Sequence, residues 1–242
     1  MLSLSYIENL QARLADLAAG EQKKIAQVAE VISGSLMNDG LLHVFGCGHS
    51  AALVSEAFYR AGGLVPVNPI YETSLMLNEG AVKSSMLERT HGYARHILDN
   101  YETRPGEVLI IFSNSGVNPM PVEMAIEAKA KGLVVVAVTS MEYRNEKSRH
   151  EGGKKLYEIA DFVIDTKIPL GDGLTELTEG RTIAPGSTVI CAAVMNMLVC
   201  EIGEIYVRAG KTPPFFISGN IEGGMDHNKS YIEKYRSRIK SL

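Results

Sequence analysis

Short apolar runs alternate with amphipathic segments along most of this chain. Runs at 41–46, 64–69, 107–112, 133–140 and 161–166 have the length and composition of strands. Segments at 50–60, 83–98 and 119–131 have the spacing of helices. The central runs, such as "VLIIF", are continuous rather than alternating, which is typical of strands buried on both faces. The pattern predicts an α/β fold, a three-layer αβα sandwich with a five-stranded parallel sheet.

Both ends of the chain are predicted to be helical. Apolar residues recur at helical spacing up to Leu17, Gly20 follows as a stop signal, and a second apolar stripe starts at Ile25. We therefore expect one domain over 1–242. Its parts are an N-terminal helical pair (1–38), an α/β core (40–210) and a C-terminal segment (211–242) with a helix over 229–241. The apolar stripe of the first helix needs a partner surface, and most soluble oligomers are symmetric, so we expect a homodimer or homotetramer.

Composition narrows the class of protein. The net charge is −4 and no basic block is present, which argues against a nucleic-acid partner. The three cysteines show no CxxC spacing and favour a reducing compartment. Charged residues at the N-terminus argue against a signal peptide. The apolar stretch 189–200 is short for a membrane span and is expected to be a core helix. These features predict a cytoplasmic protein with no membrane partner.

Two predicted strands end in glycine and short polar residues just before a helix. These turns are "FGCGHS" (45–50) and "FSNSGVN" (112–118). A helix N-terminus offers free N–H groups, and glycine lets an anion approach the backbone, so the pair predicts a phosphate site. Serine and glycine are also ordinary turn residues, and this plainer interpretation stays open. The candidate ligands in the turns are Gly48, His49, Ser50, Ser113, Asn114, Ser115, Gly116 and Asn118.

The pairing of "GCGHSA" with "SNSG" resembles the sugar isomerase (SIS) domain family, whose members bind phosphosugars. The middle of the chain, about 40–165, is most similar to phosphoheptose isomerases. There "RPGEVLIIFSNSG" and the short "ETS" at 72–74 have counterparts. The resemblance implies a phosphosugar pocket in which Ser50, Ser113, Ser115 and Asn118 hold the phosphate. Glu72, at the end of the second predicted strand, is a further candidate to contact substrate hydroxyls.

The chain departs from phosphoheptose isomerases at their metal site. The family resemblance places a histidine and a glutamate ligand six and ten residues after the serine of the first turn. Here these positions are Glu56 and Arg60. Arginine does not ligate metals, so we expect no metal site of that kind and no cofactor.

Proton transfer next to a carbonyl requires an acid or base near the phosphate turns. The catalytic candidates are Glu56, behind the first turn, Glu88, and His227 in the glycine-rich 218–228. MurNAc-6-phosphate etherases, which are also relatives within the sugar isomerase family, have a functional glutamate in the helix of this region, and Glu88 is its nearest match. Each candidate has a plainer reading: a surface glutamate for Glu56 and Glu88, and a tail contact for His227. Ser187 and Thr188 start the long apolar helix and are either a helix cap or sugar contacts.

The function predicted from these residues is aldose–ketose isomerisation of a sugar phosphate by general acid/base proton transfer. Two alternatives stay open. One is a sensor that binds a phosphosugar without turning it over. The other is a phosphosugar lyase or etherase, in which Glu88 would be the base.

Overall fold

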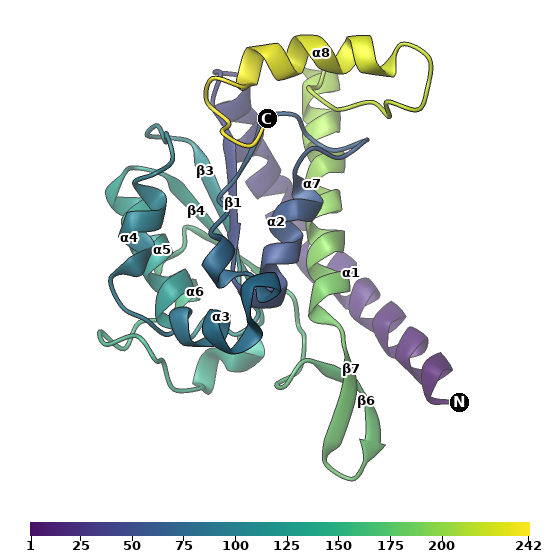
Figure 1. The fold of residues 1–242 in the computed structure, drawn as a ribbon. Helices are drawn as coiled ribbons and strands as arrows, with labels where there is room; N and C mark the ends of the chain where they lie inside the picture. Colours follow the sequence, from purple (N-terminus) through teal and green to yellow (C-terminus); the bar gives the residue numbers. More distant parts are fainter.

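The computed structural model describes all residues, 1–242, and its centre is one five-stranded parallel sheet (Figure 1). The strands are β1 (Leu42–Gly46), β2 (Val67–Pro69), β3 (Val108–Phe112), β4 (Val134–Thr139) and β5 (Phe162–Asp165). Their order in the sheet is β2-β1-β3-β4-β5, and every neighbouring pair is parallel. The predicted fold class is confirmed.

The sheet is covered by helices on both faces (Figure 1). One face carries α1 (Leu2–Leu36), α2 (Ala51–Ala57) and α7 (Ser187–Arg208); the other carries α4 (Tyr93–Leu98), α5 (Pro119–Ala130) and α6 (Leu156–Ile159). Alternate residues of a strand supply the two cores. In β3, Ile110 packs with the α1 side and Ile111 with the α5 side. Burial on both faces explains why the strand sequences are continuously apolar.

The N-terminal helical pair was a wrong prediction, because the segment is the single helix α1. Gly20 lowers helix propensity by about 1 kcal/mol relative to alanine, but tertiary packing of the helix offsets this cost. Leu17 and Ile25 on either side of it lie in the same buried stripe. A Cβ on Gly20 would lie 2.0 Å from the Lys167 ammonium, which donates to the Asp16 carbonyl. This glycine makes room for a side chain and does not end the helix.

Other boundaries also differ from the prediction. The segment 83–98 forms two short helices, α3 (Ala81–Leu87) and α4, and Gly92, with φ +76°, lies in the turn before α4. The helix predicted over 50–60 is the shorter α2, which follows a 3₁₀ turn at Gly48–Ser50. The final helix is α8 (Gly224–Tyr235) rather than 229–241. An antiparallel hairpin of β6 (Gly173–Thr178) and β7 (Arg181–Pro185) was not predicted at all.

Helix α7 is a core helix, as expected from its sequence. By length and apolar composition it is the one helix that could cross a membrane. In the fold it packs along α1 and α2, and Ile190, Val194 and Leu198 are buried in the core on that face of the sheet. Such packing is typical of a central helix in an α/β domain.

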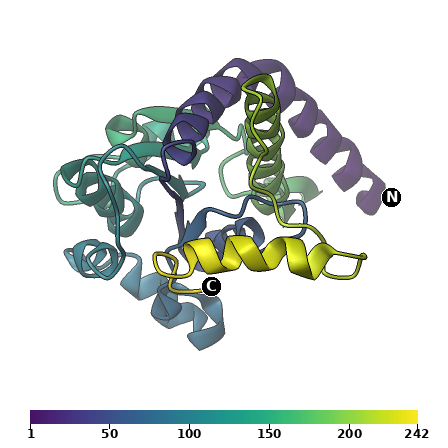
Figure 2. The ribbon, with the colours of Figure 1, turned by 90° about the horizontal axis from the view of Figure 1, so that it is seen from above.

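Helix α8 lies across the amino-end side of the sheet, away from the ends of β1 and β3 (Figures 1 and 2). Lys234 pairs with Asp39 at 2.8 Å, just before β1. After the helix, Arg238 reaches the carboxylate of Glu107, just before β3, at 2.8 Å. The C-terminal segment is therefore fastened to the edge where the strands begin.

Candidate functional site

The two polar turns lie side by side at the carboxyl edge of the sheet. β1 and β3 are neighbours, and Gly46 at the end of β1 pairs in register with Phe112 at the end of β3. The chain leaves β1 toward β2 on one side and returns to β3 on the other. This reversal makes the gap between β1 and β3 a topological switch point, where ligands of open α/β sheets bind.

The second turn is shaped by hydrogen bonds to the neighbouring strands. The Asn114 carbonyl accepts from the Ser140 amide at 2.9 Å, and the Asn114 side-chain oxygen accepts from the Thr166 hydroxyl at 3.2 Å. Gly116 has φ +60°, and a Cβ there would lie 2.9 Å from the Thr139 hydroxyl oxygen. Asn114 and Gly116 thus set the shape of the turn.

The donors available to an anion come from the turn itself rather than from helix α5. Pro119 and Pro121 have no N–H, and the Met120 amide donates to the Glu88 carbonyl at 3.1 Å. In contrast, the backbone amides of Ser115 and Val117 have no protein acceptor. A chain of unpaired amides in a turn is itself an anion-binding concavity. The expectation of a phosphate on the α5 terminus is therefore replaced by one on the turn.

Serine hydroxyls add to these backbone donors. Ser113 is buried, and its hydroxyl oxygen accepts from the Gly116 amide at 3.3 Å, which leaves its O–H to donate. Ser115 is half-buried and its side chain has no protein partner. In the first turn, Gly48 has φ +56°, Ser50 is half-buried and His49 is exposed. The amides of Gly48 and His49 are also unpaired.

Glu88 approaches the two turns from the end of α3. Its Oε1 accepts from the side-chain N–H of Asn118 at 2.8 Å, and the Asn118 oxygen accepts from Arg149 at 2.7 Å. Burial and the nearby charge of Glu88 raise the pKa of the Cys47 thiol well above its usual range. A raised pKa keeps the Cys47 thiol protonated, and its cause places the carboxylate of Glu88 close to the first turn.

Comparison with known proteins assigns this arrangement to a family. The sequence profile of the SIS domain matches residues 5–140, more than half of the chain. The chain belongs to the SIS domain family. A UPF0309 protein of Caldanaerobacter subterraneus subsp. tengcongensis is 46% identical over 247 residues, with 100% of both chains covered, and its name states no activity.

Solved structures share the SIS fold at low identity. A phosphoheptose isomerase from Francisella tularensis superposes with a TM-score of 0.56 at 15% identity, over 83% of this chain and 95% of that one. The Vibrio vulnificus NanR protein, complexed with ManNAc-6P, gives a TM-score of 0.51 at 15% identity, over 100% of this chain and 68% of that one. At this identity the likeness shows the fold alone.

Two predicted site glutamates of this SIS domain are engaged locally. Glu56 accepts from Arg60 at 2.6 Å, an exposed ion pair one turn apart on and just after α2. The two residues that stand at the metal-ligand positions of phosphoheptose isomerases thus pair with each other. Glu72 accepts from the Ser74 hydroxyl at 2.5 Å and from its amide at 3.3 Å, which caps a 3₁₀ turn.

Other predicted residues are capped or distant. The Ser187 hydroxyl and amide both donate to Asp172, at 2.6 and 2.8 Å, so the N-terminus of α7 already has its own carboxylate. Thr188 is exposed. His227 lies on α8, where its Nε2 is 3.2 Å from the Phe215 carbonyl. Because α8 is on the amino-end side of the sheet, His227 cannot reach the turns of its own chain (Figure 1).

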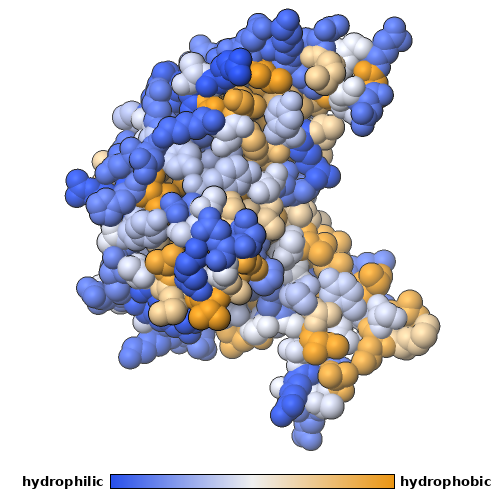
Figure 3. Space-filling view, viewed as in Figure 1, coloured by the Kyte–Doolittle hydropathy of each residue, from blue (hydrophilic) through white to orange (hydrophobic).

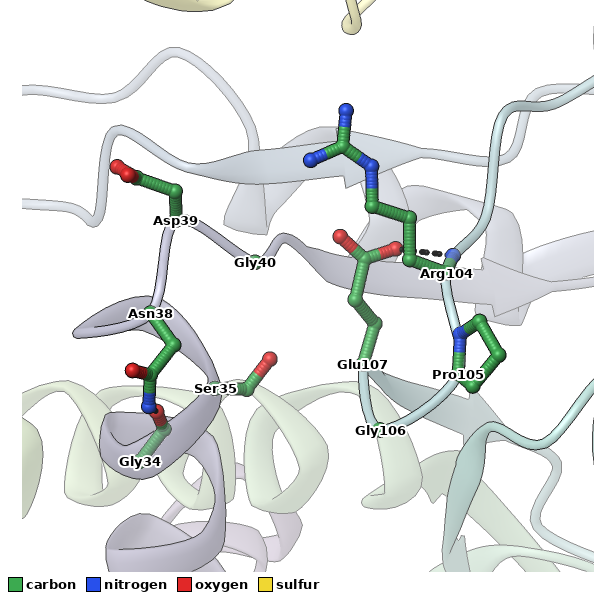
Figure 4. Close-up of a pocket in the computed structure, with 9 residues that line it drawn as sticks. All are labelled: Gly34, Ser35, Asn38, Asp39, Gly40, Arg104, Pro105, Gly106 and Glu107. Carbon is green, nitrogen blue, oxygen red and sulfur yellow. Dashed lines mark hydrogen bonds between the residues drawn. The ribbon is translucent and has the colours of Figure 1, made fainter.

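A polar cavity of about 330 Å³ lies at this opposite edge of the SIS domain, between the end of α1 and the start of β3 (Figure 4). The carboxylate of Glu107 in its wall already has its hydrogen bonds from within the protein. Glu107 accepts from the Arg104 amide, the Leu41 amide, His43 and Arg238, at 2.8 to 2.9 Å. Burial acts to raise the pKa of Glu107, but the hydrogen bonds from His43, Arg238 and the Arg104 amide outweigh it and lower the pKa to about 2. This cavity belongs to the scaffold.

Sequence reasoning missed Arg149, which lies in a charged surface excursion over 142–155. Nothing in the pattern of that segment separates Arg149 from Arg144, which makes no side-chain hydrogen bond. The contact depends on how the excursion folds back onto the second turn, which is a tertiary property.

Proposed function

We propose that this SIS domain binds a sugar phosphate and catalyses its aldose–ketose isomerisation, with Glu88 as the general base. The observation that carries the proposal is the placement of two serine turns with unpaired amides at the switch point between β1 and β3. Four amides and three hydroxyls there can surround a phosphate without a lysine or arginine. The carboxylate of Glu88 is held next to them by a half-buried hydrogen bond from Asn118.

The chemistry requires little more than a positioned carboxylate. The base removes a proton from the carbon next to the carbonyl, which leaves an enediolate. A proton then moves from the hydroxyl on that carbon to the former carbonyl oxygen, and the protonated base returns its own proton to the former carbonyl carbon. Glu88 Oε1 is held by Asn118, whereas Oε2 accepts no hydrogen bond from the protein and is free to take the proton. Glu56 is less suited, because it pairs with Arg60 in an exposed position.

The similar structures support a sugar phosphate as the ligand. One is a phosphoheptose isomerase, and another is complexed with ManNAc-6P. The proposed setting is the cytoplasm, where sugar phosphates occur and where the free thiols of Cys47, Cys191 and Cys200 stay reduced. We also propose that the protein acts as a homodimer or homotetramer.

The first experiment is a thermal-shift screen of the full chain with pentose, hexose, heptose and amino-sugar phosphates, followed by turnover assays on the hits. We expect a rise in melting temperature with at least one phosphosugar and none with its unphosphorylated sugar. Glu88→Gln should retain binding and lose turnover by 10²- to 10⁴-fold, the usual contribution of a general base.

Glu56→Gln is the matched control, since it removes a carboxylate from the same edge but should leave turnover within about twofold. Binding of a phosphosugar without turnover would contradict isomerisation and favour a sensor. Elimination of a substituent, with loss of activity in Glu88→Gln, would favour the lyase or etherase alternative. No binding of any phosphosugar would contradict the proposal as a whole.

A further inference from the structure

The amide of Asn118 links the half-buried carboxylate of Glu88 to an arginine from a distant part of the chain. Asn118 is 8% exposed. Its Nδ2 donates to Glu88 Oε1 at 2.8 Å, and its Oδ1 accepts from the Arg149 guanidinium at 2.7 Å. The three side chains form one continuous chain of hydrogen bonds, called the relay below, that ends at the group proposed as the base.

Elementary hydrogen-bond chemistry fixes the direction of this relay. A guanidinium can only donate, an ionised carboxylate can only accept, and an amide has one end of each kind. The amide oxygen therefore faces Arg149, and the NH₂ group faces Glu88. Without the arginine, the amide oxygen would lose its protein donor, and the amide would be held only by its bond to Glu88.

Arg149 is itself held by the backbone of the second turn. Its amide donates to the Val117 carbonyl at 2.9 Å, one residue before Asn118. Seven residues later the Leu156 amide donates to the Gly116 carbonyl at 2.9 Å. The Ser148 hydroxyl, one residue before the first of these anchors, donates to the Lys154 carbonyl at 2.6 Å and closes the loop. The excursion is thus fastened to the same turn that offers the anion site.

We infer that Arg149 is a positioning residue: through Asn118 it holds Glu88 with one oxygen anchored and the other free beside the phosphate turns. The inference rests on the proposed role of Glu88 as the base. It also gives the excursion 142–155 a role, since the excursion delivers a charge to the site without itself touching substrate.

The first test compares Arg149→Met with Arg144→Met in the full chain. Arg144 lies in the same excursion and its side chain has no hydrogen-bond partner, so its loss removes an equal charge without breaking the relay. On the phosphosugar that is turned over, Arg149→Met should lower kcat about tenfold with KM within about twofold, because binding groups are untouched. Arg149→Lys should restore part of kcat. An unchanged kcat in Arg149→Met, or an equal loss in Arg144→Met, would overturn the inference.

A double-mutant cycle separates the relay from a general effect of charge. If Arg149 acts only through Asn118, then Arg149→Met should add nothing in an Asn118→Leu background. Losses that multiply would show that Arg149 acts by another route and would overturn the inference. Asn118→Leu also removes the residue that precedes α5, so its melting temperature is compared with that of the wild type first.

The last measurement needs no substrate. In ¹⁵N-labelled protein the side-chain amide of Asn118, assigned by its loss in Asn118→Leu, should give two distinct protons in the wild type and in Arg144→Met. In Arg149→Met these signals should shift or broaden as the amide is released. If the signals change but no phosphosugar is turned over, the relay stands and the proposed isomerase function fails. If turnover is found and the signals are unchanged, the relay fails alone.

Discussion

At the scale of single residues, the proposed phosphate site depends on hydrogen-bond donors that have no acceptor within the protein. The Ser115 hydroxyl is half-buried and unpaired, and the amides of Ser115 and Val117 have no protein acceptor. Unpaired donors that converge on one point favour an anion, because each would otherwise depend on water.

Ser115→Ala should therefore weaken phosphosugar binding about ten- to a hundredfold, the equivalent of roughly 1.5–3 kcal/mol for a hydrogen bond to a charged group. Titration calorimetry with the best ligand of the thermal-shift screen measures this change. The melting temperature of the free protein should hardly move. Ser237→Ala, an exposed serine with no hydrogen bond on the opposite side of the sheet, is the control. Equal affinity in Ser115→Ala and Ser237→Ala would show that the turn is not the phosphate site.

Residue-scale reasoning located the two turns, whose role as a phosphate site stays a prediction, and it missed the groups that act through others. Ser113 and Ser115 stand in a local pattern of strand, glycine and helix, which the sequence displays directly. Asn118 was predicted as a phosphate ligand, but its amide is engaged by Glu88 and Arg149, which lie 30 and 31 residues away. Partners at that separation leave no periodic signal.

At the scale of elements, the buried strands were easier to predict than helix α1 or the hairpin. A buried parallel strand is marked by its own residues, as in β3. Helix α1 continues through Gly20 because Leu17 and Ile25, on either side of it, are buried against parts of the chain far away in sequence. The hairpin of β6 and β7 contains polar residues and projects from the body, so it has no apolar run to mark it (Figure 1).

Glu107, just before β3, leads to a prediction of how the stability of the fold depends on pH. Glu107 is 2% exposed and its pKa is about 2, below the ordinary value of 4.5. A lowered pKa in the folded state stabilises the fold above about pH 4.5, and this contribution is lost as the pH falls toward 2. A shift of this size corresponds to about 3 kcal/mol. Glu107→Gln should thus lower the free energy of unfolding at pH 7 and flatten its decline in acid.

Urea unfolding at pH 7 and pH 3 measures both effects. The matched control is Glu102→Gln, which removes an exposed carboxylate that also contacts Arg238, at 3.0 Å. That variant should stay within about 0.5 kcal/mol of the wild type, since exposed ion pairs contribute little. If Glu107→Gln kept the full acid dependence of the wild type, Glu107 would not be the group that titrates.

At the scale of the whole molecule, the N-terminal end of α1 and the hairpin project from the body and present apolar side chains to the surface (Figure 3). Leu4 is 54% exposed, Ile7 46% and Ile183 of β7 43%. Leu2, Tyr6, Ile7 and Ile183 line a cavity of about 440 Å³ between the two elements. Contiguous exposed apolar surface of this kind is typical of interaction sites in proteins.

A second copy of the chain is the partner we propose for this surface. Deletion of the helix is no test, because Ile25, Val28 and Ile32 of the same α1 are buried in the core and the fold would be lost with them.

Ile7→Glu places a charge on the exposed stripe and spares the core. It should convert a dimer or tetramer to smaller species at micromolar concentration, because an unpaired charge is costly to bury in an apolar interface. Ala12→Glu adds the same charge to the same helix, about 140° around its axis from Ile7, and should leave the assembly intact. Sedimentation velocity measures both, and circular dichroism checks that α1 is still folded. A wild-type protein that sediments as a monomer would refute the interface, and so would an Ile7→Glu variant that sediments exactly as Ala12→Glu does.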